Sequence, residues 1–154
     1  MKRIITLLIM VLLFLSSLTN ISANNSTSTY IDEVFEDGSY IEIVIEEHEA
    51  SLTREMTTKT ARKTATYKDS NGNELWTFYV SGIFKYDGTT STCTSSVVNA
   101  SSLDSNWKIH SKSATKSNAT ASATCTAKQY TLGICVKTVT RNLSLTCSPN
   151  GTLS

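Results

Sequence analysis

Residues 57–86, TTKTARKTATYK-DSNGN-ELWTFYVSGIFKY, carry the clearest structural pattern in the chain. Two strand-like runs flank residues 69–73, where Asn-Gly supplies the positive φ angles that a tight hairpin turn needs. Six alternate positions of the second run share one parity: Trp76, Phe78, Val80, Gly82, Phe84 and Tyr86. Since alternate residues of a strand point to the same face, the pattern predicts a hairpin whose aromatic face is the centre of the core. The glycine on that face indicates a bulge or room for an aromatic ring.

Alternation of apolar and polar residues predicts further strands on both sides of this hairpin. Ile41, Ile43 and Ile45 alternate with polar or branched residues, which predicts a half-buried strand over residues 40–47. Downstream strands are expected at about residues 89–98, 107–115, 119–127 and 134–147. In the last run, Ile134 and Val136 have the opposite parity to the apolar residues that follow, which implies a bulge. About seven strands with short turns predict an all-β fold, an antiparallel β-sandwich or open barrel.

The N-terminus has the features of a secretory signal peptide. Lys2 and Arg3 precede an apolar run from Ile4 to Leu15, and the small residue Ala23 follows, so we expect cleavage after residue 23. The run of about 12 residues is shorter than the ~20 that span a bilayer, and no second run follows. We therefore expect a secreted, extracellular chain without a transmembrane segment. Residues 24–39 should form a polar, acidic, partly disordered segment in which structure begins at about Tyr30. Residues 40–154 should form one β domain.

Charge is unevenly distributed in this chain of net charge +1. Between residues 24 and 49 every charged side chain is acidic: Asp32, Glu33, Glu36, Asp37, Glu42, Glu46, Glu47 and Glu49. After Asp104 every charged side chain is basic: Lys108, Lys112, Lys116, Lys128, Lys137 and Arg141. These six are candidate contacts for an anionic polymer or lipid headgroups. The alternative is that the acidic segment lies beside them in the same sheet and neutralises them.

Four cysteines in an exported chain predict two disulfides, with three possible pairings. Cys125 and Cys135 stand symmetrically about Tyr130, so a hairpin turning there would bring them within the ~5.5 Å that a disulfide spans. The remaining pair, Cys93 with Cys147, would close a loop of about 54 residues. The intervals are too wide for a structural zinc site, so we expect no metal and no cofactor.

Neither histidine lies in a recognisable catalytic motif. His48 is surrounded by glutamates at a strand end, and His110 lies between Ile109 and Ser111; neither is near a Gly-x-Ser-x-Gly elbow. A triad assembled across distant strands would make the chain a small secreted hydrolase, and this alternative stays open. We assign no catalytic residue and expect a protein that is not an enzyme.

Membrane activity is an alternative to surface binding. Serine- and threonine-rich strands between residues 89 and 128 resemble, in composition, the hairpins that some pore-forming toxins insert, so a membrane-active or bacteriocin-like protein is an alternative. Ala119, Ala121 and Ala123 are small for a lipid-facing strand, which weakens that alternative. Nucleic acid is not an expected partner, because no stacking array of aromatic residues accompanies the basic ones.

One resemblance covers most of the chain after residue 23. The segments that carry it are NGNELW at 71–76, FKYDG at 84–88, TCT at 92–94, DSNW at 104–107 and LTCS at 145–148. They resemble a group of small exported proteins of Gram-positive bacteria with no established activity. The resemblance implies an extracellular β domain in which Cys93 pairs with Cys147 and the other two cysteines are an addition. The sequence thus predicts a secreted, non-enzymatic β domain that binds an envelope polymer or another cell's surface.

Overall fold

The computed structural model describes residues 25–52 and 56–154, so the expected signal peptide, residues 1–23, lies outside the described residues. Eight β-strands account for most of them: β1 (Asn25–Val34), β2 (Tyr40–Leu52), β3 (Thr57–Lys68), β4 (Glu74–Tyr86), β5 (Ser91–Ser102), β6 (Trp107–Ser117), β7 (Thr120–Thr131) and β8 (Ile134–Thr146). No helix that could cross a membrane is found in this part of the chain.

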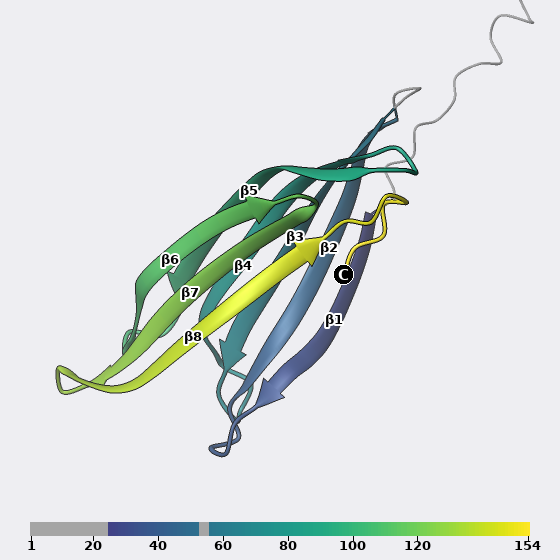
Figure 1. Ribbon diagram of the computed structural model, residues 1–154. Helices are drawn as coiled ribbons and strands as arrows, with labels where there is room; N and C mark the ends of the chain where they lie inside the picture. The colour runs from purple at the N-terminus through teal and green to yellow at the C-terminus, as the bar shows by residue number, and fades with distance from the viewer. Residues whose placement is uncertain (1–24, 53–55) are drawn as a thin grey trace, which may run out of the picture.

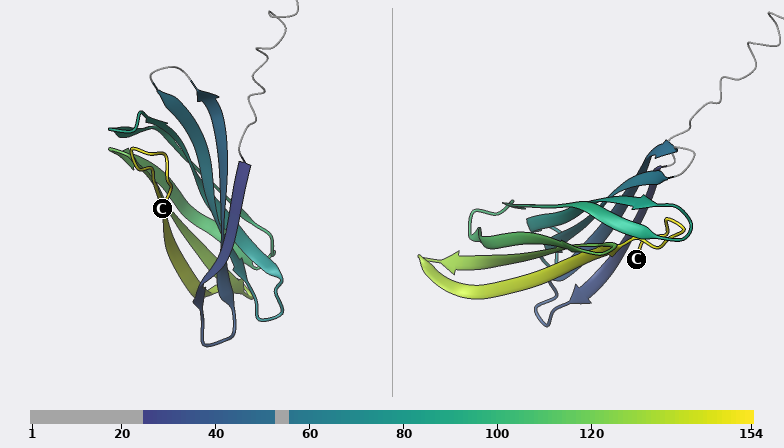
Figure 2. Two further views of the ribbon diagram at one scale, coloured as in Figure 1. Left: turned by 90° about the vertical axis from the view of Figure 1, so that its right-hand side faces the viewer. Right: turned by 45° about the horizontal axis from the view of Figure 1, so that its top comes forward.

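The strands form two antiparallel sheets that face each other as a sandwich (Figures 1 and 2). The large sheet has the order β1-β2-β3-β4-β5, and the small sheet has the order β6-β7-β8. Every neighbouring pair within a sheet runs antiparallel, so the chain winds up and down through short turns. The prediction of an antiparallel all-β fold is confirmed, with one strand more than expected.

The predicted hairpin is confirmed as β3 and β4. Asp69 organises its turn, because its carboxylate accepts hydrogen bonds from the backbone N–H groups of Asn71 and Asn73, at 2.9 and 2.8 Å. Gly72 takes the left-handed backbone conformation there, with a φ angle of 85°. Hydrogen bonds from Asn73 and neighbouring N–H groups also lower the pKa of the Asp69 carboxyl. The turn is therefore specified by its own side chains, as the sequence indicates.

The aromatic face of β4 forms the centre of the core, as predicted. Trp76, Phe78 and Phe84 are fully buried, and Trp76 stacks on Tyr67 of β3 with ring centroids 5.8 Å apart. Opposite them lie the small inward residues of β7: Ala121, Ala123, Cys125 and Ala127. A Cβ at Gly82 would lie 2.5 Å from the Phe84 ring and 2.9 Å from the Ala121 Cβ. Gly82 thus makes room for a ring and for the close approach of β7.

The outer face of the small sheet consists largely of hydroxyl side chains, which explains part of the serine- and threonine-rich composition. Neighbouring strands pair these groups directly: Thr120 lies 2.9 Å from Thr146, and Thr126 lies 3.0 Å from Thr140, oxygen to oxygen. Cross-strand hydroxyl pairs stabilise a sheet modestly and leave its face hydrophilic.

Strand β1 corrects the expectation of a partly disordered segment with structure from about Tyr30. It begins at Asn25 and pairs with β2 from Asn25 opposite His48 to Val34 opposite Tyr40. Nearly all of its side chains are exposed, so the strand has no alternation of buried and exposed positions to mark it in the sequence. Its order comes from backbone hydrogen bonds to the edge of the large sheet.

Candidate functional site

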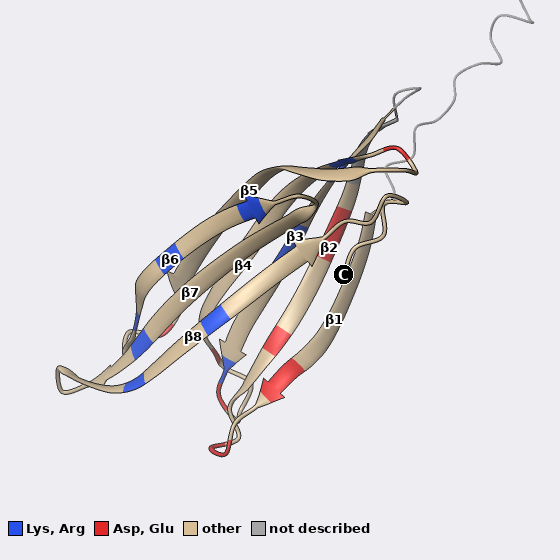
Figure 3. Cartoon of the chain, in the orientation of Figure 1, with Lys and Arg blue, Asp and Glu red and all other residues tan. Residues whose placement is uncertain are grey.

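The six basic residues of the small sheet divide into two groups by direction. Lys112, Lys116 and Arg141 pair in register with inward-facing residues of β7, and Lys137 pairs with Gln129. All four lie on β6 or β8, the edge strands, so their long side chains pass the rim of the core and reach the large sheet. Lys108 and Lys128 point instead to the outer face. Figure 3 shows these basic positions on β6–β8 and the acidic ones on β1 and β2.

On the β8 side, two basic residues meet acids of the N-terminal segment. The Lys137 Nζ lies 2.7 Å from the Asp37 carboxylate, and Arg141 forms an ion pair with Glu33. Both cations also lie over the Phe35 ring, 5.2 and 5.4 Å from its centroid. The alternative that the acidic segment neutralises the basic residues therefore holds for Lys137 and Arg141. The ion pairs join the two sheets, however, and do not lie within one sheet as expected.

On the β6 side, the contacts go to neutral groups. Lys112 donates to the Asn99 side-chain oxygen at 2.7 Å, and Lys116 donates to the Thr94 carbonyl at 2.5 Å. Both acceptors belong to β5, so these lysines hold the edges of the two sheets together. Four of the six predicted contact residues are thus engaged in the fold.

Lys108 and Lys128 remain, and they face each other directly across β6 and β7. The Lys108 Nζ lies over the Tyr130 ring, 5.3 Å from its centroid. Among the described residues, no acid forms an ion pair with either lysine. Because like charges directly opposite in a sheet destabilise it, this pair is not explained by the stability of the fold.

Next to this pair, the β7–β8 hairpin ends in an apolar tip, residues 131–136. Leu132 is 99% exposed, Ile134 is 69% exposed and Val136 is 57% exposed. The turn residues Leu132 and Gly133 have φ angles of 50° and 81°. We call Lys108, Lys128 and residues 130–136 together the free end of the small sheet. Sequence reasoning missed the tip, although a Leu-Gly turn where Asn-Gly is preferred was a visible signal.

The observed turn also corrects one predicted disulfide. The hairpin turns at residues 132–133, not at Tyr130, so Cys125 lies opposite Arg141 and Cys135 lies opposite Tyr130. Five residues at about 3.3 Å each separate the two cysteines along the strands by about 16 Å, more than twice the reach of a disulfide. The predicted bulge is confirmed, because Val136 has no partner in the register.

All four cysteines are free thiols in the structure. Cys93 and Cys147 lie at the same end of the sandwich, since their N–H groups donate to the successive carbonyls of Asn118 and Ala119, at 2.7 and 3.0 Å. Both are buried. Burial raises the pKa of the Cys93 thiol, and it raises that of Cys125 to about 11.

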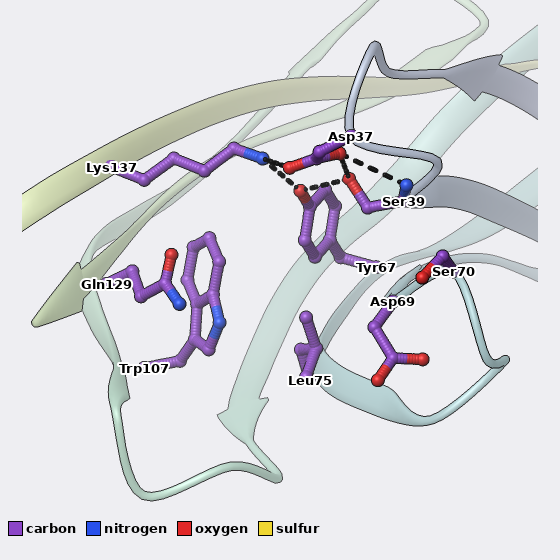
Figure 4. A pocket seen from close by; sticks show the side chains of 9 residues that line it. All are labelled: Asp37, Ser39, Tyr67, Asp69, Ser70, Leu75, Trp107, Gln129 and Lys137. Carbon is purple, nitrogen blue, oxygen red and sulfur yellow. Dashed lines mark hydrogen bonds and ion pairs between the residues drawn. The ribbon is translucent and has the colours of Figure 1, made fainter. Parts of the chain in front are cut away.

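A polar hollow of about 180 Å³ lies between the sheets where β8 approaches the β1–β2 turn (Figure 4). The Tyr67 hydroxyl lies at its centre, 2.6 Å from both the Ser39 Oγ and the Lys137 Nζ. Ser39 also hydrogen-bonds to Asp37, which in turn pairs with Lys137. The hollow is lined by Asp37, Ser39, Tyr67, Asp69, Ser70, Leu75, Trp107, Gln129 and Lys137.

The protonation states of this cluster follow from its hydrogen bonds. Those from Lys137 and Ser39 hold the pKa of Asp37 well below its ordinary value. Burial by itself lowers the pKa of Lys137, but the hydrogen bonds to Asp37 and Tyr67 outweigh it and leave this pKa above its ordinary value. Lys137 is therefore a cation at neutral pH and a poor general base. Ser39 is buried, with only 5% of its surface exposed. The cluster acts as a brace between the sheets.

The histidines lie elsewhere. The exposed His48 bonds to the Asn25 side chain at 2.9 Å, and His110 is exposed on β6. Within residues 25–52 and 56–154, neither histidine contacts both a serine and a carboxylate, and no cluster of residues could hold a metal ion. Comparison of the chain with protein-family models, curated proteins and solved structures finds no match.

Proposed function

We propose that this chain is a secreted, non-enzymatic β domain that binds phosphate-bearing groups of a cell surface through the free end of its small sheet. The observation that carries the proposal is the outward-facing pair of Lys108 and Lys128. The two lysines repel each other in the isolated domain, and an anionic ligand between or beside them would remove that repulsion. Phosphate groups are the common chemistry of wall polymers and lipid headgroups.

The surroundings of the pair support a binding role. Residues 107–146, the whole small sheet, contain no acidic side chain. The other four basic residues on it already contact the large sheet, so Lys108 and Lys128 carry the outward positive charge of this face. A surface of one charge sign attracts oppositely charged partners and speeds their encounter.

The chemistry of the polar hollow supports a function without catalysis. A serine nucleophile needs an adjacent base that can accept its proton. Ser39 instead contacts the Tyr67 hydroxyl and the carboxylate of Asp37, whose low pKa makes it a weak base. Lys137, the remaining candidate base, is held in its protonated form.

For the exported protein, we also propose a disulfide between Cys93 and Cys147. Their backbone contacts at residues 118 and 119 place these two buried cysteines at one end of the sandwich, where a bond would join β5 to the end of β8. Bond formation releases two protons and passes two electrons to an extracellular oxidant such as dioxygen. The cross-link would then stabilise the fold by about 4 kcal/mol from the entropy of a 54-residue loop.

Co-sedimentation with isolated bacterial cell envelopes tests the binding proposal. The Lys108→Gln/Lys128→Gln double variant should bind about 25-fold more weakly than the wild type, at roughly fivefold for each lysine near an anionic surface. The matched control, Arg62→Gln/Lys85→Gln, removes the same charge from exposed positions of β3 and β4 in the large sheet and should bind as the wild type does. Wild-type binding should weaken as salt is added. Equal binding by the two double variants would overturn the proposal.

A further inference from the structure

We infer that the anionic surface recognised by this domain is a lipid bilayer, into whose headgroup region Leu132, Ile134 and Val136 insert while Lys108 and Lys128 contact lipid phosphates. The inference rests on the proposed function and names the partner of the same site. It accounts for a feature that charge alone does not explain, which is the apolar tip beside the lysine pair.

The tip projects where nothing else in the fold reaches it. In Figure 1 and in the right-hand view of Figure 2, the turn between β7 and β8 stands away from the other turns of the sandwich. Its three large apolar side chains are 57–99% exposed. Single exposed apolar residues are common, but three within five positions at the end of a projecting hairpin form a surface suited to an apolar partner.

The backbone at Leu132 gives a second, independent argument. Its φ angle of 50° lies in the left-handed region, which a leucine adopts only with strain. The β6–β7 turn has a residue with almost the same φ, 49°, and there the chain uses Asn118. Asparagine tolerates this conformation well, so the chain has the ordinary residue at one turn and a strained, fully exposed leucine at the other. Strain that the fold does not use is typical of functional positions.

The arrangement of charge and apolar surface matches an anionic bilayer. The lysines lie behind the tip, so their flexible stems can hold the ammonium groups at the depth of the phosphates while the tip goes deeper. Three acids at this end of the sandwich, Asp37, Asp69 and Asp104, belong to other turns and accept hydrogen bonds there. A soluble phosphate polymer would engage the lysines but would have no apolar layer for the tip.

The length of the tip limits how deeply it inserts. Residues 132–136 are fewer than the about nine to eleven residues that one membrane-crossing strand requires. The contact is therefore confined to the interface between headgroups and acyl chains, and dye trapped inside vesicles should stay there when the protein binds. Rapid dye release would contradict this shallow contact.

Vesicle flotation with residues 24–154 tests the inference; residues 1–23 are omitted because their apolar run would itself enter bilayers. The probes are phosphatidylcholine vesicles with and without phosphatidylglycerol, and immobilised polyglycerol phosphate as a lipid-free anionic polymer. The wild type should bind the mixed vesicles much better than pure phosphatidylcholine. Leu132→Asn should lose about tenfold or more, since one leucine side chain no longer leaves water. The Lys108→Gln/Lys128→Gln variant should also bind them weakly.

The outcomes separate this inference from the function on which it rests. Equal vesicle binding by the wild type and Leu132→Asn would overturn insertion of the tip. Binding to polyglycerol phosphate without binding to vesicles would overturn the bilayer as partner and leave the proposed function standing. No binding to either probe would overturn both. Ile134→Ser gives a second readout, because this residue is also exposed and its loss removes no core contact.

Discussion

Replacing Leu132 by asparagine should make the domain more stable, although it removes a large apolar side chain. The side chain is 99% exposed, so its removal gives up almost no buried area. At a φ angle of 50° a leucine is strained by about 1 kcal/mol or more, and asparagine followed by Gly133 is the preferred pair for this turn. We therefore expect the free energy of unfolding to rise by about 1 kcal/mol.

Urea unfolding and thermal melting of residues 24–154 measure this effect. For a domain of this size, about 1 kcal/mol corresponds to a rise in Tm of roughly 3–4 °C. The matched control is Asn118→Leu, which places a leucine at a φ angle of 49° in the β6–β7 turn and should lower stability by a similar amount. A lower stability for Leu132→Asn would refute the reasoning, because it would mean that Leu132 packs against the fold.

Three further predictions concern the brace, the thiols and the core. Because the pKa of Asp37 is lower in the folded than in the unfolded chain, Asp37 stabilises the fold above about pH 4 and loses this effect as the pH falls. The stability difference between the wild type and Asp37→Asn, from urea unfolding, should be constant near neutral pH and shrink as the pH falls below about 4; a difference that stays constant down to about pH 3 would contradict the brace. Peptide mapping of the exported protein without reduction should find Cys93 joined to Cys147, whereas a Cys125–Cys135 peptide would show that the observed register is wrong. Gly82→Ala should destabilise by about 1–3 kcal/mol through crowding of Phe84 and Ala121, with partial recovery in Gly82→Ala/Ala121→Gly; an unchanged urea midpoint would argue against close packing there.

The sequence predicts those parts of the fold in which burial alternates along a strand. Hairpin β3–β4 and the inward face of β7 were predictable because one side of each strand packs in the core. Strand β1 was not, because an exposed edge strand is held by backbone hydrogen bonds that any residue can make. The division into five and three strands was not predictable either, since it depends on pairings between residues far apart in the sequence.

The site shows the same division. A basic C-terminal half was evident from composition, but which lysines are engaged depends on whether a strand is an edge and which face each residue occupies. The turn lies at Leu132-Gly133, about two residues beyond the predicted position at Tyr130. This difference separates Cys135 from Cys125 and leaves the apolar tip exposed. Equal spacing of two cysteines about one residue of the sequence is weak evidence for a disulfide between them, because the hairpin can turn at a neighbouring residue and change the register.

Hydrogen exchange of the domain, measured with and without isolated cell envelopes, tests the central claim most directly. If the free end of the small sheet is the binding surface, amide exchange should slow in peptides covering residues 128–137 and stay unchanged in the β1–β2 turn, residues 35–39. Slower exchange in that turn, with the β7–β8 hairpin unaffected, would place binding at the polar hollow and contradict the account.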